Sequence, residues 1–490
     1  MKRTGSDELF KLIHSLTANE KGYFQKYAKR HSGKSNDYLK LFNALDKMEQ
    51  YDEKKIKQQF KNLRALKNYL FTLILDSLFI SETAPSPGMA ALKGIVKINL
   101  LLKKGLTRKA LKLIAEYKLF AASSELYFLQ GQLLKIEANV QRAGWKVAEG
   151  IDKIRLAQDS IRLAEDRQRN VDDFLLQQYL GFCLLQLQIH SSAKYEVDNV
   201  IDSAFLMDPA NSLSPYAERM RLAALVKYYL LKEDIARFHE TTGKIYSLEK
   251  ERWHKLKGKL NPDDYLKAIN NYIVSSLRVK DTNLAAQLAA KLLEIQLSDK
   301  NLLIENMVRY TNLNQNILWT TGKHTEGEIF SKEMLKKFSL LEYINLFWEK
   351  SIAIMGTKAL FEFSNAHYAE SLKTLNFFNP SSINRLSIED KKSAEFLNLL
   401  IQFEIGNYEL IPPLLKSIKK RHETLNKEDH LFLSAFNKYH HSPKQFFGFL
   451  QKNCSEKLAL FQMLHLKDWI ESKISRKPLA EIISKNYSVG

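Results

Sequence analysis

The sequence predicts an all-α protein made of stacked helix pairs, preceded by a small basic helical domain. Three observations point to this fold class. Glycine and proline number only 18 and 10 among 490 residues, as is usual where long helices dominate. Hydrophobic residues make up 45% of the chain and charged residues 26%, which is enough apolar surface for a folded protein. Apolar side chains also recur three and four residues apart, which is the period of one helix face.

Residues 1–83 are expected to form the basic helical domain. A first helix is predicted from Glu8 to Leu16, and Thr17 and Glu20 have the spacing of a capping box at the start of a second helix. Two prolines in the segment 81–88 mark a linker and place a domain boundary near residue 85. Either a capping or docking domain or a helix-turn-helix that reads DNA fits this composition. The first is favoured because no recognition-helix pattern is visible.

Helix pairs are predicted over residues 89–320 and again over residues 328–490. In the first pair, Gly105 permits a tight turn between two helices, and Ala110 lets the second helix approach the first closely. Gly131 follows large apolar residues in the pattern that opens the next pair. Gly406 marks a further turn in the C-terminal part, where the apolar helix over 458–470 is expected to cap the stack.

The stretch 174–211 is predicted to be the clearest helical hairpin. Its small residues Gly181, Ala193 and Ala204 allow two antiparallel helices to approach closely. Pro209 is expected to end the second helix, because proline cannot continue one.

These positions resemble those of the tetratricopeptide repeat superfamily. The resemblance is carried by Leu180–Gly181, Ala193, Ala204 and Asp208–Pro209 in one unit, and by Gly105, Ala110 and Gly406 in others. It implies degenerate hairpins of about 34 residues that stack into a right-handed superhelix. Members of this superfamily are mostly protein-binding scaffolds whose concave face holds peptides or partner helices. The Gly105–Ala110 hairpin also resembles RNA-binding pentatricopeptide units.

The sequence contains no complete catalytic or metal-binding motif. Two cysteines, Cys183 and Cys454, are too few for a disulfide framework and favour a reducing, cytoplasmic location. Cys183 is expected to be buried in a helix rather than to act as a nucleophile. The segments 322–324 and 422–426 each lack residues that a phosphate-binding loop or a zinc-protease helix requires. We therefore expect no catalytic residue, no cofactor and no metal, and the apolar runs are too short to span a membrane.

The formal net charge of +19 arises from 74 basic and 55 acidic residues. Such an excess favours polyanions or acidic protein surfaces, but short scattered clusters of lysine are typical of solvated helix faces. We expect a non-enzymatic scaffold or adaptor for an unidentified protein or peptide. Tyr228 and Tyr229 are candidate groove aromatics, because adjacent helix residues cannot face the same core. A nucleic-acid-binding repeat protein or transcriptional regulator is the alternative, and an enzyme is a third option.

Overall fold

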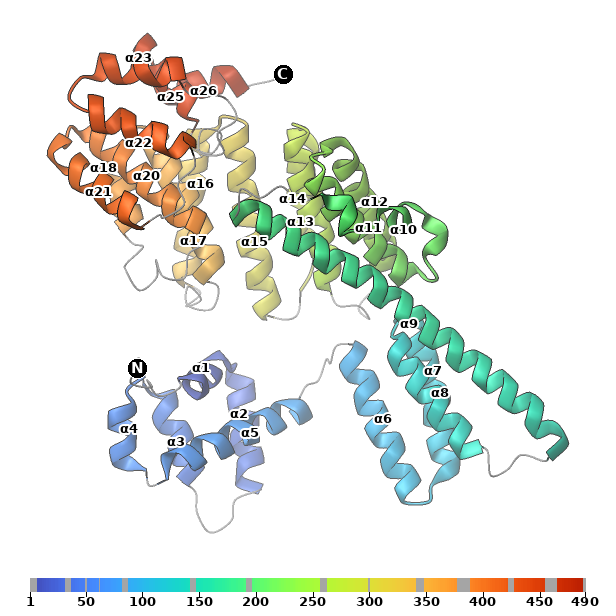
Figure 1. Ribbon diagram of the computed structural model, residues 1–490. Coiled ribbons are helices and arrows are strands. Elements are labelled where there is room, and N and C mark those ends of the chain that lie inside the picture. Colours follow the sequence, from blue (N-terminus) through green and yellow to red (C-terminus); the bar gives the residue numbers. More distant parts are fainter. Residues whose placement is uncertain are drawn as a thin grey trace. The chain divides into compact units, whose positions relative to one another are not determined.

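The computed structural model describes residues 7–30, 37–48, 51–60, 62–81, 87–141, 147–190, 196–255, 262–297, 300–340, 348–376, 388–421, 427–453 and 465–487. Within these ranges the protein is all-helical and has no β-strand, as predicted. The chain forms two compact units, Met1–Leu129 and Gln130–Gly490. Figure 1 labels their helices.

Five helices at the start of the first unit share one hydrophobic core. Their bounds are α1 (Glu8–Ser15), α2 (Ala18–Arg30), α3 (Asp37–Asp46), α4 (Glu53–Gln59) and α5 (Leu63–Ser81). All members of the core lie between Leu9 and Leu78, and Phe24, Phe42 and Ile74 are among its fully buried side chains. The predicted domain boundary near residue 85 stays a prediction, because the compact unit that contains these helices extends to Leu129.

The predicted capping box at the start of α2 is confirmed. The Glu20 carboxylate accepts hydrogen bonds from the Thr17 amide at 2.7 Å and from the Thr17 hydroxyl at 2.8 Å. In return, the Glu20 amide donates to the Thr17 hydroxyl at 3.3 Å. These bonds satisfy amide groups that have no partner within the helix.

A helix pair formed by α6 (Pro87–Lys103) and α7 (Thr107–Ser123) also belongs to the first unit. Gly105 lies in the turn between them with a φ of +72°, the left-handed conformation that favours glycine. Ala110 is fully buried on α7. A Cβ atom at Gly94 would lie 2.5 Å from the Tyr117 ring, so α6 and α7 are closely packed at that point.

Helix α8 (Tyr127–Gln141) crosses from the first unit into the second. The second unit continues with α9 (Val147–His190), α10 (Ser203–Met207), α11 (Pro215–Leu231), α12 (Ile235–Lys255), α13 (Pro262–Arg278), α14 (Thr282–Glu294), α15 (Lys300–Thr320) and α16 (His324–Leu340). It then comprises α17 (Trp348–Ser364), α18 (Tyr368–Asn376), α20 (Ile388–Ile405), α21 (Ile411–Arg421), α22 (Lys427–Tyr439), α23 (Pro443–Asn453), α25 (Leu466–Ser475) and α26 (Leu479–Tyr487).

From α11 onward, each labelled helix contacts the next one along the chain. Some alternate helices also touch, since α15 contacts both α13, two helices before it, and α17, two helices after it. This is the contact pattern of helices that add side by side as the chain proceeds.

The expected hairpin over 174–211 is wrong. Helix α9 extends 44 residues, from Val147 through Gly181 to His190, instead of beginning near Phe174. The second half consists of short turns: a 3₁₀ turn at Val197–Asn199, then α10, then a 3₁₀ turn at Pro209–Asn211. The Asp202 and Asp208 side chains cap the last two, at the Phe205 and Ala210 amides. Short capped turns therefore replace the predicted second helix, although α10 does end before Pro209, as predicted.

The break predicted between residues 320 and 328 is the short turn Thr321–Lys323, with Gly322 at a φ of +71°. Helix α15 contributes Leu313 to a core with α13 and α14, and Val308 to another with α16 and α17. The division into 89–320 and 328–490 stays a prediction. Most of the predicted cap helix over 458–470 lies outside the described residues. No helix in the described part of the chain is long and apolar enough to cross a membrane.

Candidate functional site

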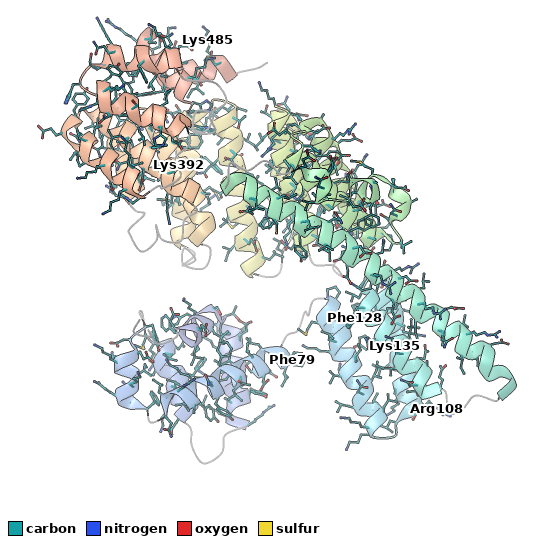
Figure 2. The ribbon with its side chains drawn as sticks, viewed as in Figure 1. Phe79, Arg108, Phe128, Lys135, Lys392 and Lys485 are labelled. Atoms are coloured by element: carbon teal, nitrogen blue, oxygen red, sulfur yellow. The ribbon has the colours of Figure 1, made fainter. Side chains whose placement is uncertain are left out.

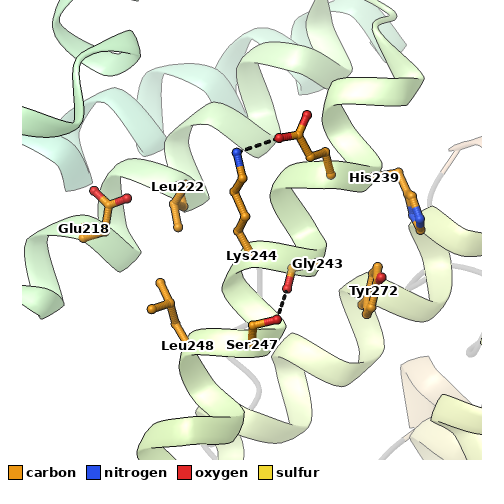
Figure 3. A pocket seen from close by; sticks show the side chains of 9 residues that line it. Glu218, Leu222, His239, Gly243, Lys244, Ser247, Leu248 and Tyr272 are labelled. Carbon is orange, nitrogen blue, oxygen red and sulfur yellow. Dashed lines mark hydrogen bonds and ion pairs between the residues drawn. The ribbon is translucent and has the colours of Figure 1, made fainter.

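A groove with a volume of about 610 Å³ lies over helix α12 in the second unit. One face of α12 forms its floor, and α11 and α13 form its two walls. Figure 3 shows residues of α11 on one side of Lys244, and residues of α13 and the start of α12 on the other. The lining residues are Glu218 and Leu222 from α11, His239, Glu240, Gly243, Lys244, Ser247 and Leu248 from α12, and Tyr272 from α13.

The helical repeat explains why these α12 residues share one face. His239, Gly243 and Ser247 follow each other at intervals of four residues, and the other three lining residues of α12 come directly after them. The preceding turn fixes the start of α12, because the Asp234 side chain accepts a hydrogen bond from the Arg237 amide at 3.0 Å.

Stacked aromatic rings join α12 to α13 behind the groove. The His239 and Tyr272 rings stack with centroids 5.2 Å apart, and Tyr246 packs on Tyr272 at 5.4 Å. Tyr246 also stacks on Tyr265, which in turn stacks on Trp253. Burial, together with the neighbouring Tyr246, raises the pKa of Tyr265, so its phenol stays neutral. This row of rings fixes the position of the Tyr272 wall.

Gly243 leaves space at the groove floor. A Cβ atom at this position would lie 3.2 Å from two ring carbons of Tyr272 and 3.3 Å from its hydroxyl. A glycine inside a helix lowers helix stability by about 1 kcal/mol relative to alanine. Here the missing side chain lets Tyr272 lie directly over the backbone of α12.

Two buried hydroxyls hold the His239 ring from behind. Its Nδ1 atom lies 3.1 Å from Ser275 Oγ, and Ser275 Oγ lies 2.6 Å from Thr242 Oγ1. The Thr242 hydroxyl is also 2.8 Å from the His239 carbonyl oxygen. The Ser275 hydroxyl is 3.0 Å from the backbone carbonyl oxygen of Tyr272. Both hydroxyls are almost completely buried, so the imidazole has a fixed orientation in the groove wall.

A buried ion network ties the three helices together. Arg219 of α11 contacts the Glu249 carboxylate of α12 at 2.5 Å, and both side chains are only 6% exposed. Arg252 lies 3.6 Å from Glu249 and 3.6 Å from Asp264 of α13. Because charges buried this deeply require partners, the network restricts the relative positions of α11, α12 and α13.

Charges that line the groove are mixed in sign. Lys244 and Glu240 form an exposed ion pair with 2.6 Å between Nζ and Oε1, and the hydrogen bond from Lys244 lowers the pKa of Glu240. The Glu218 carboxylate accepts two hydrogen bonds from the Arg221 guanidinium, both at 2.7 Å. Two carboxylates and one ammonium therefore line this groove, although the chain as a whole is strongly basic.

The sequence-predicted candidate aromatics do not line this groove. Tyr229 is buried, and its hydroxyl lies 3.3 Å from the Met207 sulfur. Tyr228 is partly buried and donates a hydrogen bond to Asp198 at 2.9 Å. Both tyrosines therefore hold the short turns that follow α9 against α11.

The predicted small-residue anchors lie in different settings. A Cβ at Gly181 would be 2.8 Å from the Lys227 side chain, so α9 approaches α11 closely there, and a Cβ at Gly131 would be 3.8 Å from Ala164 of α9. Gly406 follows α20 with a φ of +83°. Ala204 lies on α10, and Pro209 begins the 3₁₀ turn after it. Ala193 lies outside the described residues.

Cys183 is exposed, so the expectation that it is buried is wrong. It lies on the outer side of α9, two residues after Gly181, which packs on α11. In the ranges that the structure describes, no group of three or more histidine, cysteine, aspartate or glutamate residues could hold a metal ion.

A second polar cluster surrounds Glu328 of α16. Its carboxylate contacts Lys332 at 2.6 Å, Asn365 at 2.7 Å and His367 Nδ1 at 3.0 Å. Burial opposes ionisation of Glu328, but the hydrogen bonds from these three residues lower its pKa overall. All three partners stabilise the carboxylate, so the cluster joins α16 to the turn after α17.

Sequence reasoning did not identify His239, Gly243, Lys244 or Tyr272. One usable signal was Gly243, since a glycine within a helical pattern indicates close packing or a functional requirement. No family model matches the chain, and no curated protein or solved structure matches it.

Proposed function

We propose that this protein is a non-enzymatic interaction scaffold or adaptor that binds a protein or peptide segment in the groove over α12. The observation that carries the proposal is the composition of the groove. It combines an aromatic wall, two aliphatic side chains and charges of both signs, as is usual for a surface that binds a peptide or protein. The residues that line the groove do not form the continuous basic stripe that binding of a nucleic-acid phosphate backbone requires.

The proposal includes a tetratricopeptide-like, right-handed superhelical stack in a cytoplasmic protein. The contacts between consecutive helices and between α13, α15 and α17 support a stacked arrangement. In such a stack the groove presents one face of a helix between its neighbours, which suits an extended segment or a helix of the partner.

Site-specific photo-crosslinking tests the proposal. A benzophenone amino acid would replace Leu248, which lines the groove and is exposed. The matched control replaces Lys250, an exposed residue two positions later that faces about 200° away on the same helix. We expect a defined protein adduct at position 248, absent at position 250 and unchanged when nuclease is added to the lysate before irradiation. Equal labelling at both positions would contradict a groove-specific partner.

Nucleic-acid binding is the second candidate, because one helix pair of the first unit is unusually basic. The α6–α7 pair, residues 87–123, contains eight lysine and arginine residues and a single acidic residue, Glu116. Those nearest its turn are exposed: Lys103, Lys104, Arg108, Lys109 and Lys112. Figure 2 labels Arg108 and draws the surrounding side chains.

Two of these basic residues lie at a helix N-terminus, where positive charge is unfavourable. Arg108 and Lys109 are in the first turn of α7, at the positive end of the helix dipole. The residue before this turn, Leu106, provides no side-chain cap. A bound phosphate would offset both unfavourable features.

A direct binding measurement tests this second candidate. If the pair binds a phosphate backbone, a labelled single-stranded 20-mer should bind, and replacing Arg108 and Lys109 with glutamate should weaken that binding. The slope of log affinity against log salt should also fall by about one for each phosphate group that the variant no longer binds. An unchanged slope in the double variant would contradict a phosphate contact at the start of α7.

A further inference from the structure

Hydrogen bonding behind the groove determines which nitrogen of His239 carries the proton. Four short contacts connect the ring to Ser275, Thr242 and two backbone carbonyl groups. Each contact requires one hydrogen atom, and the two hydroxyls supply only two. The number of contacts that can be hydrogen bonds therefore depends on the imidazole tautomer.

Protonation at Nδ1 satisfies the most contacts. The Nδ1–H group then donates to Ser275 Oγ, Ser275 donates to Thr242, and Thr242 donates to the His239 carbonyl oxygen. This leaves only the longer 3.0 Å contact, from Ser275 to the Tyr272 carbonyl, without a hydrogen. If Nδ1 were the acceptor, it would take the Ser275 hydrogen. A second short oxygen–oxygen contact would then lack a hydrogen, which is costly in a buried network.

The Nδ1–H tautomer leaves Nε2 as a hydrogen-bond acceptor in the groove wall. The hydrogen bond described for this ring is made at Nδ1 and not at Nε2. Acceptors are also provided by Glu240 and by Ser247, whose hydroxyl hydrogen is donated to the Gly243 carbonyl at 3.0 Å. Lys244 is the only ammonium group among the lining residues, and it is paired with Glu240. The groove therefore offers more acceptors than donors.

We propose that the groove recognises an arginine side chain of the bound segment, with His239 Nε2 and Glu240 as its acceptors. This inference rests on the proposed function of the groove. A guanidinium has five N–H donors in a fixed planar arrangement, so it can donate to several acceptors at the same time. Leu222 and Leu248 provide an apolar surface for an aliphatic side chain next to the arginine.

Nitrogen-15 NMR of the histidine-labelled full chain tests the tautomer without any ligand. The His239 signals are assigned by their loss in His239→Gln. We expect the coupling pattern of a ring protonated at Nδ1, with Nε2 in the chemical-shift range of an unprotonated nitrogen. An Nε2–H pattern in the neutral ring would overturn the inference, whether or not the groove binds peptides.

Peptide selection tests the ligand class. The probes are four pools of hexapeptides with arginine, lysine, glutamine or glutamate at one central position and random residues around it. The arginine pool should bind the full chain at least about ten-fold more tightly than the glutamate pool, as a charged hydrogen bond allows. Citrulline in place of arginine should remove most of the preference, because it keeps the shape but lacks the charge.

Variants connect the preference to the named residues. Glu240→Gln and His239→Leu should each reduce the arginine preference by about ten-fold, while His239→Gln, whose amide oxygen can accept, should keep part of it. The preference of Lys250→Gln should match that of the unmodified chain. Binding of all four pools with equal affinity would overturn the arginine inference but not the groove. If no pool bound, and no adduct formed at position 248, both proposals would be wrong.

Discussion

The Tyr272 ring stacks on the His239 imidazole at a centroid distance of 5.2 Å and lies directly over Gly243. This relationship joins two helices at the one place where α12 carries no side chain. It fixes the His239 ring in the groove wall. The proposed recognition of a guanidinium depends on the position that this contact gives to His239 Nε2.

Replacing Gly243 with alanine should weaken peptide binding without unfolding the protein. The added methyl group would lie 3.2 Å from the Tyr272 ring, which must then move by a few tenths of an ångström. Alanine favours the helix by about 1 kcal/mol, and this gain offsets the strain. Fluorescence anisotropy with the arginine pool should therefore show lower affinity at nearly unchanged stability.

Gly356→Ala is the matched control for this change. Gly356 lies inside α17, and a Cβ there would meet no atom within 4 Å. This variant should gain up to about 1 kcal/mol in stability and keep its peptide affinity. Equal losses of affinity in both variants would contradict a specific role for Gly243.

Removing the buried carboxylate of Glu249 should destabilise the three helices that form the groove. Glu249→Gln leaves Arg219 and Arg252 near each other without the charge that both contact. Breaking a buried ion pair by removing one partner costs about 3–5 kcal/mol. Hydrogen exchange of α12 and α13 peptides should accelerate accordingly. Lys255→Ala, which breaks an exposed pair with Glu251, should leave the same exchange rates unchanged.

Acid should loosen the region around His324 at a pH where most surface groups have not yet changed charge. Burial, reinforced by the nearby His465, lowers the pKa of His324 from 6.5 to about 3. Between these values the unfolded chain binds a proton that the folded chain does not, so stability falls as the pH falls through that window. This one group gives a slope of about 1.4 kcal/mol per pH unit. The free energy of opening of α16, measured by hydrogen exchange, should depend less steeply on pH between pH 6 and pH 4 in His324→Phe. An identical slope in this variant would contradict the lowered pKa of His324.

The capping box of the first unit should contribute a measurable share of its stability. Thr17→Ala removes the hydroxyl that accepts from the Glu20 amide and donates to its carboxylate. N-cap substitutions of this kind cost about 1 kcal/mol. Exchange at the start of α2 should accelerate by about five-fold, while Ser15→Ala, which removes only a bond to the Leu12 carbonyl within the preceding helix, should have a smaller effect. Equal effects would show that the box adds no stability.

Local signals in the sequence predicted the all-helical structure, the capping box and several turns. Thr17 and Glu20 lie within a few residues of each other, so their capping chemistry is visible in the sequence. The stretch 174–211 failed because apolar spacing does not show where a helix stops. Asp202 acts there as the cap of a short helix, although it fits a polar position of one longer helix equally well.

The groove could not be predicted because its walls come from separate helices. His239 and Tyr272 are 33 positions apart, and helical periodicity does not distinguish a side chain in a groove from one in a core. Tyr228 and Tyr229 stand out in the sequence because they are adjacent, yet both contact the segment after α9. The +19 charge likewise gave no hint that two of the three charged lining residues are acidic.

Both proposals for the second unit depend on a partner segment that occupies the groove over α12. Mass spectrometry of the adduct formed from a photo-reactive residue at position 248 detects such a segment directly, because it identifies both the partner and the crosslinked residues. We expect one dominant protein partner, crosslinked within a few residues of an arginine and absent from the control at position 250. A nucleotide adduct, or the same mixture of proteins at both positions, would contradict occupancy of the groove by a partner segment.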